Sequence, residues 1–199
     1  MSVVDLVFLF SFLFCAVLVI RLLWLPMRRD WPKWLATARW LVAFIVIYAT
    51  ALVATALIMP RRELPVGERK CFDDWCVAAS GLELQPSPEL CPGAAAVWVA
   101  SVEVSSVARR IRQRAADATV EVEDLLGRRY ASCSAGGPKH LRDMLGPGER
   151  FSVSMPFALP AGGRPVGLVV HHGAFPGVII IGADQSWLHQ PTLFRTIVR

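Results

Sequence analysis

The sequence predicts two transmembrane helices followed by an all-β sandwich of the immunoglobulin-like class, and three observations support this. First, 54% of the 199 residues are hydrophobic and 19% are charged, whereas a soluble domain carries about 25% charge. Second, the apolar excess gathers in residues 1–60. Third, the remaining residues show short strand patterns between Gly and Pro turns, with almost no helical periodicity.

Residues 1–60 form the predicted membrane anchor. Residues 3–25 carry no charge except at Asp5 and Arg21, and residues 41–59 carry none. A bilayer core about 30 Å thick needs roughly 20 apolar residues in a helix, so both runs are long enough to span it. The first run does not fit a cleaved signal peptide, because its positive charges follow the apolar residues rather than precede them.

The charge between the two apolar runs predicts their orientation. Residues 21–40 hold five Lys or Arg residues against a single Asp, whereas the N-terminal tail holds no Lys or Arg. Short loops rich in Lys and Arg stay on the cytoplasmic side. We therefore expect a bacterial inner-membrane protein whose N-terminus and C-terminal domain lie on the periplasmic side.

Residues 26–40 are expected to form a basic interfacial loop on the cytoplasmic side. Pro26 and Pro32 predict interruptions of the helix, and indole side chains prefer the headgroup zone of a bilayer. The segment is predicted to be either a short helix along the membrane surface or a plain aromatic belt. Its candidate interfacial anchors are Trp24, Trp31, Trp34 and Trp40.

The second apolar run carries two pairs of small residues four positions apart, a spacing that lets helices approach closely. These candidate packing residues are Thr50 with Ala54 and Ala51 with Thr55. Their partner is either the first helix of this chain or a helix of another subunit. Neither run has His, Glu, Lys or Arg at its centre, which argues against an ion path and against axial ligation of haem or chlorophyll by this chain.

Residues 61–70 are the expected short linker, and residues 71–199 the expected periplasmic domain. Strand patterns recur in this domain with turn residues between them. Stretches such as VWVASVEV alternate apolar with small or polar residues, which is typical of a strand with one buried face. The expected strands are residues 71–77, 95–105, 118–125, 128–132, 151–159, 166–172, 178–182 and 193–198.

Turn motifs in this domain carry a resemblance to a known family. They are D-x-x-G-x-x-Y at Asp124, Gly127 and Tyr130, L-x-P-G-E at Leu145, Pro147, Gly148 and Glu149, and F-x-x-P at Phe157 and Pro160. On these motifs, residues 97–172 or so resemble a broad bacterial family of extracytoplasmic immunoglobulin-like domains of unknown function. The family has an Asn after the first strand, where this chain has Ser105 or Ser106. The resemblance implies a β-sandwich outside the cytoplasm and no shared catalytic residues.

Four of the five cysteines lie in the expected periplasmic domain, at Cys71, Cys76, Cys91 and Cys133. An even count in an oxidising compartment favours disulfides. Cys71 and Cys76 are too close to pair along an extended strand but can pair around a bend. We expect structural bridges that reach Cys91 and Cys133, with the connectivity left open.

No sequence motif for catalysis, for a metal or for a cofactor occurs in the chain, and its basic residues do not form a nucleic-acid surface. We therefore expect a non-catalytic accessory subunit of an energy-transducing membrane complex. The first expectation is a bacterial photosynthetic reaction centre with its light-harvesting antenna, with pigments or lipids contacted only peripherally. The alternatives are a subunit of a respiratory complex and a free-standing periplasmic ligand-binding or sensor protein.

Overall fold

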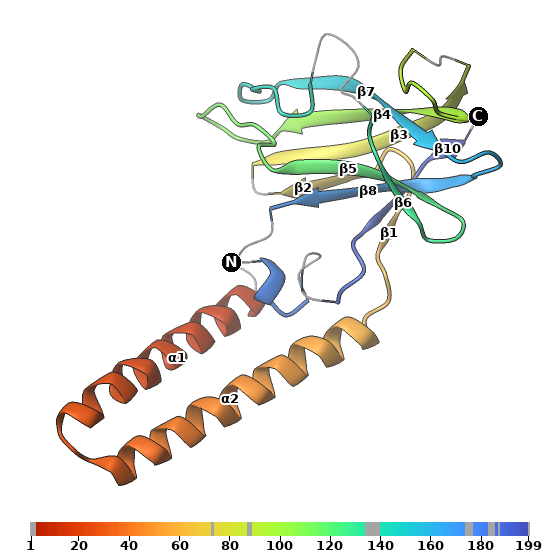
Figure 1. Cartoon of the computed structure of the whole chain (residues 1–199). Coiled ribbons are helices and arrows are strands. Elements are labelled where there is room, and N and C mark those ends of the chain that lie inside the picture. Colours follow the sequence, from red (N-terminus) through yellow and green to blue (C-terminus); the bar gives the residue numbers. More distant parts are fainter. Residues whose placement is uncertain are drawn as a thin grey trace. The chain divides into compact units, whose positions relative to one another are not determined.

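The computed structural model describes residues 3–72, 74–86, 89–133, 140–173, 177–182, 186 and 188–198. It divides into two compact units. The helical unit comprises Met1–Pro60 and Ala174–Gln190, and the sandwich unit comprises Arg61–Gly173 and Pro191–Arg199. Two N-terminal apolar helices followed by a β-sandwich confirm the predicted fold class (Figure 1).

The helical unit contains α1 (Val3–Met27) and α2 (Trp31–Ile58), and both are long and apolar enough to cross a membrane. Residues 31–40, expected as a separate surface segment, instead continue into α2. Pro32 lies in the first turn, where a helix needs no amide donor, and Asp30 caps that turn by accepting from the Lys33 amide at 3.4 Å. At 28 residues, α2 is about 42 Å long, so it exceeds the hydrocarbon core.

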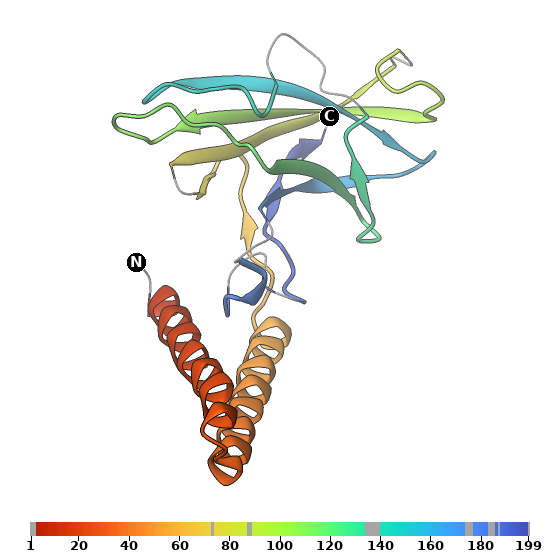
Figure 2. The ribbon, with the colours of Figure 1, turned by 60° about the vertical axis from the view of Figure 1, so that its left-hand side comes forward.

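The two helices pack along a seam that has the alternating four- and three-residue spacing of a heptad pattern. They are close at the loop between them and diverge toward their other ends (Figure 2). The rings of Phe14 and Phe44 lie 4.9 Å apart across the seam. The less exposed positions along it include Ser11, Cys15, Leu18, Leu22 and Leu25 of α1 and Trp34, Thr37, Leu41, Phe44 and Tyr48 of α2.

The sandwich unit consists of two sheets whose neighbouring strands are antiparallel, except for the pairs β1 with β9 and β10 with β3. One sheet has the order β1 (Glu63–Leu64), β9 (Leu193–Arg195), β8 (Pro165–His172), β5 (Ala118–Asp124) and β6 (Arg129–Ala131). The other has the order β10 (Ile197–Val198), β3 (Trp75–Gln85), β4 (Ala96–Ser106) and β7 (Arg150–Leu159), and β2 (Arg69–Phe72) also pairs with β3. The C-terminal segment therefore supplies one strand to each sheet.

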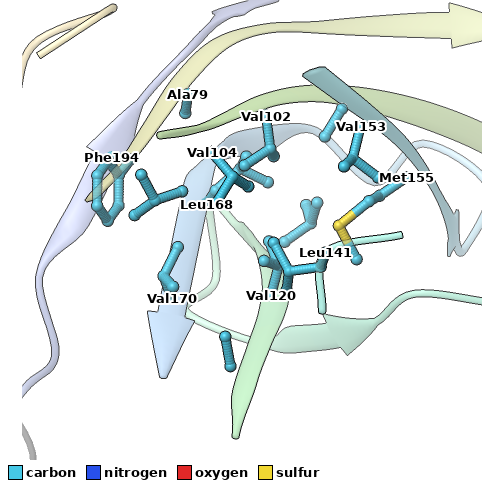
Figure 3. Close-up of a cluster of buried hydrophobic side chains, with 14 of the residues drawn as sticks. Ala79, Val102, Val104, Val120, Leu141, Val153, Met155, Leu168, Val170 and Phe194 are labelled. Carbon is cyan, nitrogen blue, oxygen red and sulfur yellow. The ribbon is translucent and has the colours of Figure 1, made fainter. Parts of the chain in front are cut away.

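The core lies between the two sheets, and alternation along the strands fills it. Val102 and Val104 of β4 and Val120 of β5 are at most 3% exposed. Figure 3 shows these side chains together with Leu168 and Phe194 in one cluster. The predicted one-sided burial of β4 and β5 is thus present in the structure. Gly167 of β8 is required by packing, because a Cβ there would lie 2.3 Å from the carbonyl oxygen of Phe194.

The L-x-P-G-E motif forms a tight turn before β7. Glu149 Oε2 accepts a hydrogen bond from the Gly146 amide at 2.6 Å, and Gly148 has a φ of 72° that glycine adopts without strain. Leu145 is fully buried in the core. The motif therefore fixes a turn and anchors it, which is structural rather than catalytic chemistry.

Three expected elements differ in the structure. The expected linker 61–70 holds β1 and the start of β2, so the chain joins the sandwich almost directly after α2. The expected strand 71–77 is a hairpin, because the chain bends between β2 and β3. The expected strand 178–182 belongs to the helical unit, where it begins with the short 3-10 helix η1 (Gly177–Ile179). Ile179 lines a groove together with residues of both helices, and the Tyr48 hydroxyl donates to the Ile179 carbonyl at 2.7 Å.

The four cysteines of the sandwich unit form two disulfides. Cys71 pairs with Cys76 across the β2–β3 hairpin, and Cys91 pairs with Cys133 over a separation of 42 residues. The bend between β2 and β3 is what allows the short-range pair. Cys15, in α1, is free.

The two bridges should differ in their contribution to stability. A crosslink restricts the unfolded chain more when it closes a longer loop, which gives about 4 kcal/mol for Cys91–Cys133 and about 2 kcal/mol for Cys71–Cys76. We expect the double substitution Cys91→Ser with Cys133→Ser to lower the free energy of unfolding more than Cys71→Ser with Cys76→Ser. Urea unfolding of the full chain in detergent, followed by near-UV circular dichroism, measures both. Equal losses would contradict the loop-length argument.

Candidate functional site

The four tryptophans near the interhelical loop divide into two groups. Trp34 packs within the helix pair, where its Nε1 donates to the Leu22 carbonyl at 3.1 Å. Trp24, Trp31 and Trp40 are 56%, 59% and 68% exposed and form the outward group. The Arg28 guanidinium lies 5.6 Å from the centroid of the Trp24 ring. Three of the four candidate anchors are therefore available to a headgroup region, and their role as anchors stays a prediction.

The small residues of α2 lie mostly outside the contact with α1. Thr50 and Ala51 are exposed, and Ala54 and Thr55 are partly exposed. The buried residues in this half of α2 are instead Leu52 and Ala56. The Thr50 hydroxyl donates to the Val46 carbonyl of its own helix at 2.7 Å, so its hydrogen bond is satisfied within α2. Packing of the small pairs against another helix stays a prediction.

An apolar groove lies where α1 and α2 diverge. Its volume is about 270 Å³, and its lining includes Phe8 and Cys15 of α1, Phe44 and Leu52 of α2, and Ile179. The Tyr48 hydroxyl at its rim is already bonded to the Ile179 carbonyl. The lining suits an acyl chain or another hydrophobic group, so the groove is a candidate place for the expected peripheral contact with lipids or pigments.

The first residue of the sandwich unit is held by a nearly buried ion pair. Both Nη atoms of Arg61 donate to the Glu123 carboxylate, and the Arg61 Nε donates to the Pro191 carbonyl at 2.9 Å. The Arg129 Nε adds a third contact to Glu123 at 3.2 Å. The side chains of Arg61 and Glu123 are 17% and 8% exposed. Burial raises the pKa of Glu123, but the hydrogen bonds from the two arginines outweigh burial and hold its pKa below the usual value.

The D-x-x-G-x-x-Y motif forms the turn between β5 and β6, directly after Glu123. Asp124 Oδ1 accepts from the Leu126 and Arg128 amides, each at 2.9 Å. Asp124 Oδ2 accepts from the Arg128 Nε at 2.8 Å and from the Tyr130 hydroxyl at 3.0 Å. Gly127 has a φ of 74°, which a side chain would disfavour. The residues of this motif thus build one hydrogen-bonded turn.

The adjacent histidines of β8 point to opposite faces of their sheet, as the strand pattern requires. His171 Nε2 lies 3.1 Å from Glu121 Oε2. The His172 ring packs instead against Phe72 and Trp75, at centroid distances of 5.4 and 5.1 Å. Across the described ranges, no group of three or more His, Cys, Asp or Glu residues lies close enough to hold a metal ion.

Two features of the sandwich unit could not be predicted from the sequence. Arg61 and Glu123 are 62 positions apart, and each also fits a solvent-exposed charge. Lys70 of β2 is similar: burial, assisted by repulsion from Arg62, lowers its pKa to about 8, and its Nζ donates to the Thr192 hydroxyl at 2.8 Å. No local sequence pattern marks Arg61, Glu123 or Lys70 as buried.

An apolar helix pair joined to a disulfide-bonded β-sandwich defines the class of this protein, because it fits a membrane-anchored extracytoplasmic domain. The chain matches no protein-family model and no curated protein.

Solved structures similar to this chain are β-sandwiches at low identity. The secreted protein MPT63 of Mycobacterium tuberculosis is 18% identical, with 57% of this chain and 92% of that chain covered and a TM-score of 0.47. An uncharacterized β-sandwich protein of Clostridium difficile is 12% identical, with coverages of 69% and 93% and a TM-score of 0.39. A conserved hypothetical protein of Bacillus anthracis is 13% identical, with coverages of 54% and 87% and a TM-score of 0.38.

Removing the arginine that holds Glu123 should destabilise the sandwich. Arg61→Ala leaves a nearly buried carboxylate with a weaker set of donors, so we expect a loss of about 2–3 kcal/mol in the free energy of unfolding. The matched control is Arg69→Ala, because Arg69 pairs with Glu103 at 2.8 Å but is 49% exposed; such a surface pair contributes at most about 1 kcal/mol. Urea unfolding of the full chain in detergent compares them. A loss for Arg61→Ala no larger than the control would contradict the structural role.

The same ion pair should make stability depend on pH. Because the pKa of Glu123 is lower in the folded chain than its usual value of 4.5, its contribution is fully present above that value and is lost as the pH falls through the lowered folded pKa. We expect the stability difference between the native chain and Arg61→Ala to shrink across this acidic range. Unfolding curves measured from pH 7 down to pH 3 test the direction, and a difference that grows on acidification would contradict it.

Proposed function

We propose that this chain is a non-catalytic accessory subunit of a larger membrane complex, anchored by α1 and α2 and bracing the complex outside the cytoplasm with its sandwich. The observation that carries the proposal is the outward face of α2. Thr50 is exposed and Ala54 partly exposed there, while the seam with α1 uses other residues. Small residues on an open helix face allow close approach of a further helix, and such packing is what holds membrane helices together.

The sandwich unit supports a bracing role. Its core is closed by two sheets, and two disulfides crosslink it. The ion pair of Arg61 with Glu123 fixes the chain to the sheet three residues after the end of α2. A stiff domain can hold neighbouring subunits at a set position, because little conformational entropy is then lost on binding.

The particular complex we propose is a bacterial photosynthetic reaction centre with its light-harvesting antenna. The apolar groove between the helices offers a surface for peripheral contact with a pigment tail or a lipid. A respiratory complex is the second candidate, and a free-standing ligand-binding protein is the third. Affinity purification of the tagged full chain in mild detergent separates them. Pigment-bearing subunits support the first candidate, haem-bearing subunits support the second, and a lone monomer overturns the subunit proposal.

Enlarging the small helix face should release the chain from its complex. We expect Thr50→Leu with Ala54→Leu to reduce co-purification of the partner subunits severalfold, because the added side chains keep the neighbouring helix away. The matched control is Val42→Leu, which changes a position of α2 that is already bulky and 60% exposed. Co-purified partner per tagged chain is the measurement. Unchanged recovery of the partner subunits with the double variant would contradict docking through α2.

A further inference from the structure

The turn between β5 and β6 presents two bulky apolar side chains. Leu125 and Leu126 are 65% and 75% exposed. Moving a leucine side chain out of water is favourable, so covering these two leucines would stabilise the bound state. The Leu125–Leu126 tip is therefore an apolar surface that gains free energy when something covers it.

This tip is rigid before it binds anything. The Asp124 carboxylate accepts four hydrogen bonds, two from amides of the turn itself and two from the side chains of Arg128 and Tyr130. The Leu125 amide donates to the Arg164 carbonyl at 3.1 Å, which ties the tip to the turn between β7 and β8. A preorganised tip loses little conformational entropy on binding.

Arginines lie close to the tip. Arg128 and Arg129 follow it and Arg61 contacts Glu123 just before it, against the carboxylates of Glu123 and Asp124. Arg164 supplies the carbonyl that accepts from the Leu125 amide. Arg128 and Arg164 are exposed. Apolar side chains close to arginines match the boundary zone of a bilayer, where acyl chains meet anionic headgroups.

Chain connectivity links this tip to the end of the membrane anchor. Arg61 follows Ile58, the last residue of α2, by three positions, which span at most about 10 Å. The Arg61 guanidinium holds Glu123, and Glu123 precedes Leu125 by two positions. Glu123, two positions before Leu125, is thus held by the first residue of the sandwich unit.

We propose that the Leu125–Leu126 tip inserts into the headgroup region of the bilayer that holds the anchor, with the exposed arginines Arg128 and Arg164 binding anionic lipid headgroups. This inference rests on the membrane anchoring in the proposed function. The tip acts as a second, shallow membrane contact of the sandwich unit. A pocket of a partner subunit is the competing occupant, and the experiment below distinguishes it.

The test uses the full chain with Cys15→Ser, so that a single added cysteine carries an environment-sensitive fluorophore. Leu126→Cys is labelled and reconstituted into vesicles of phosphatidylglycerol and phosphatidylcholine that contain a shallow lipid-borne quencher. We expect a blue-shifted emission and strong quenching. Replacing phosphatidylglycerol by phosphatidylcholine, or adding Leu125→Asp, should weaken the quenching severalfold, because the first removes the anionic headgroups and the second places a carboxylate in the tip.

Two labelled positions serve as controls. Ile111→Cys is matched in composition, since Ile111 is 60% exposed among arginines, but its loop leads into the opposite end of β5. Val46→Cys lies on α2 at a position that is 57% exposed and reports the anchor itself. Quenching at 126 that does not exceed quenching at 111, while the probe at 46 is quenched from within the bilayer, overturns the inference and leaves the anchor intact. An unquenched probe at 46 overturns the anchor instead. A blue-shifted emission at 126 that is seen only when partner subunits are present assigns the tip to a protein pocket and overturns the lipid contact.

Discussion

The sandwich unit depends on one electrostatic constraint, the carboxylate of Glu123 held by Arg61 and Arg129 at a nearly buried position. An ionised carboxylate there is tolerated only because its hydrogen-bonding capacity is filled. Since Arg61 also donates to the Pro191 carbonyl, the same side chain holds the start of the domain and the approach to its last strands. The beginning and end of the sandwich are thereby fixed to β5 at one place.

Each of the two sheets ends on one side in a very short strand. β1 has two residues and pairs with β9, and β10 has two residues and pairs with β3. Short edges such as these give other chains little strand to extend, whereas β7, with ten residues, is the long edge of the second sheet. The motif turns at Asp124 and Glu149 then set the register of the longer strands β5 and β7, so turn chemistry and edge pairing together define the two sheets.

Local patterns account for the parts of this structure that depend on neighbours in sequence. Apolar runs gave the two helices, alternation gave β4 and β5, and turn residues placed the β5–β6 hairpin. The start of α2 shows where such patterns become ambiguous, because Pro32 is compatible with a helix break and with a first helical turn, and only the cap from Asp30 decides. The apolar run 178–182 is equally compatible with a buried strand and with a segment packed on helices. The contact of Arg61 with Glu123 has no local signature, since it forms only when β5 meets the residues that follow α2.

The excursion of residues 174–190 into the helical unit has a topological consequence. The polypeptide passes between the two units after Pro60, after Gly173 and again after Gln190. The two units are therefore joined by three chain crossings. Cleavage after Gly173 or after Gln190 would leave residues 1–60 covalently joined to the sandwich unit, whereas cleavage after Pro60 would separate both helices from it. Excising the first sixty residues would not yield a self-contained fragment, because Ile179 would lose the apolar helix residues that line its groove and would be left exposed to water.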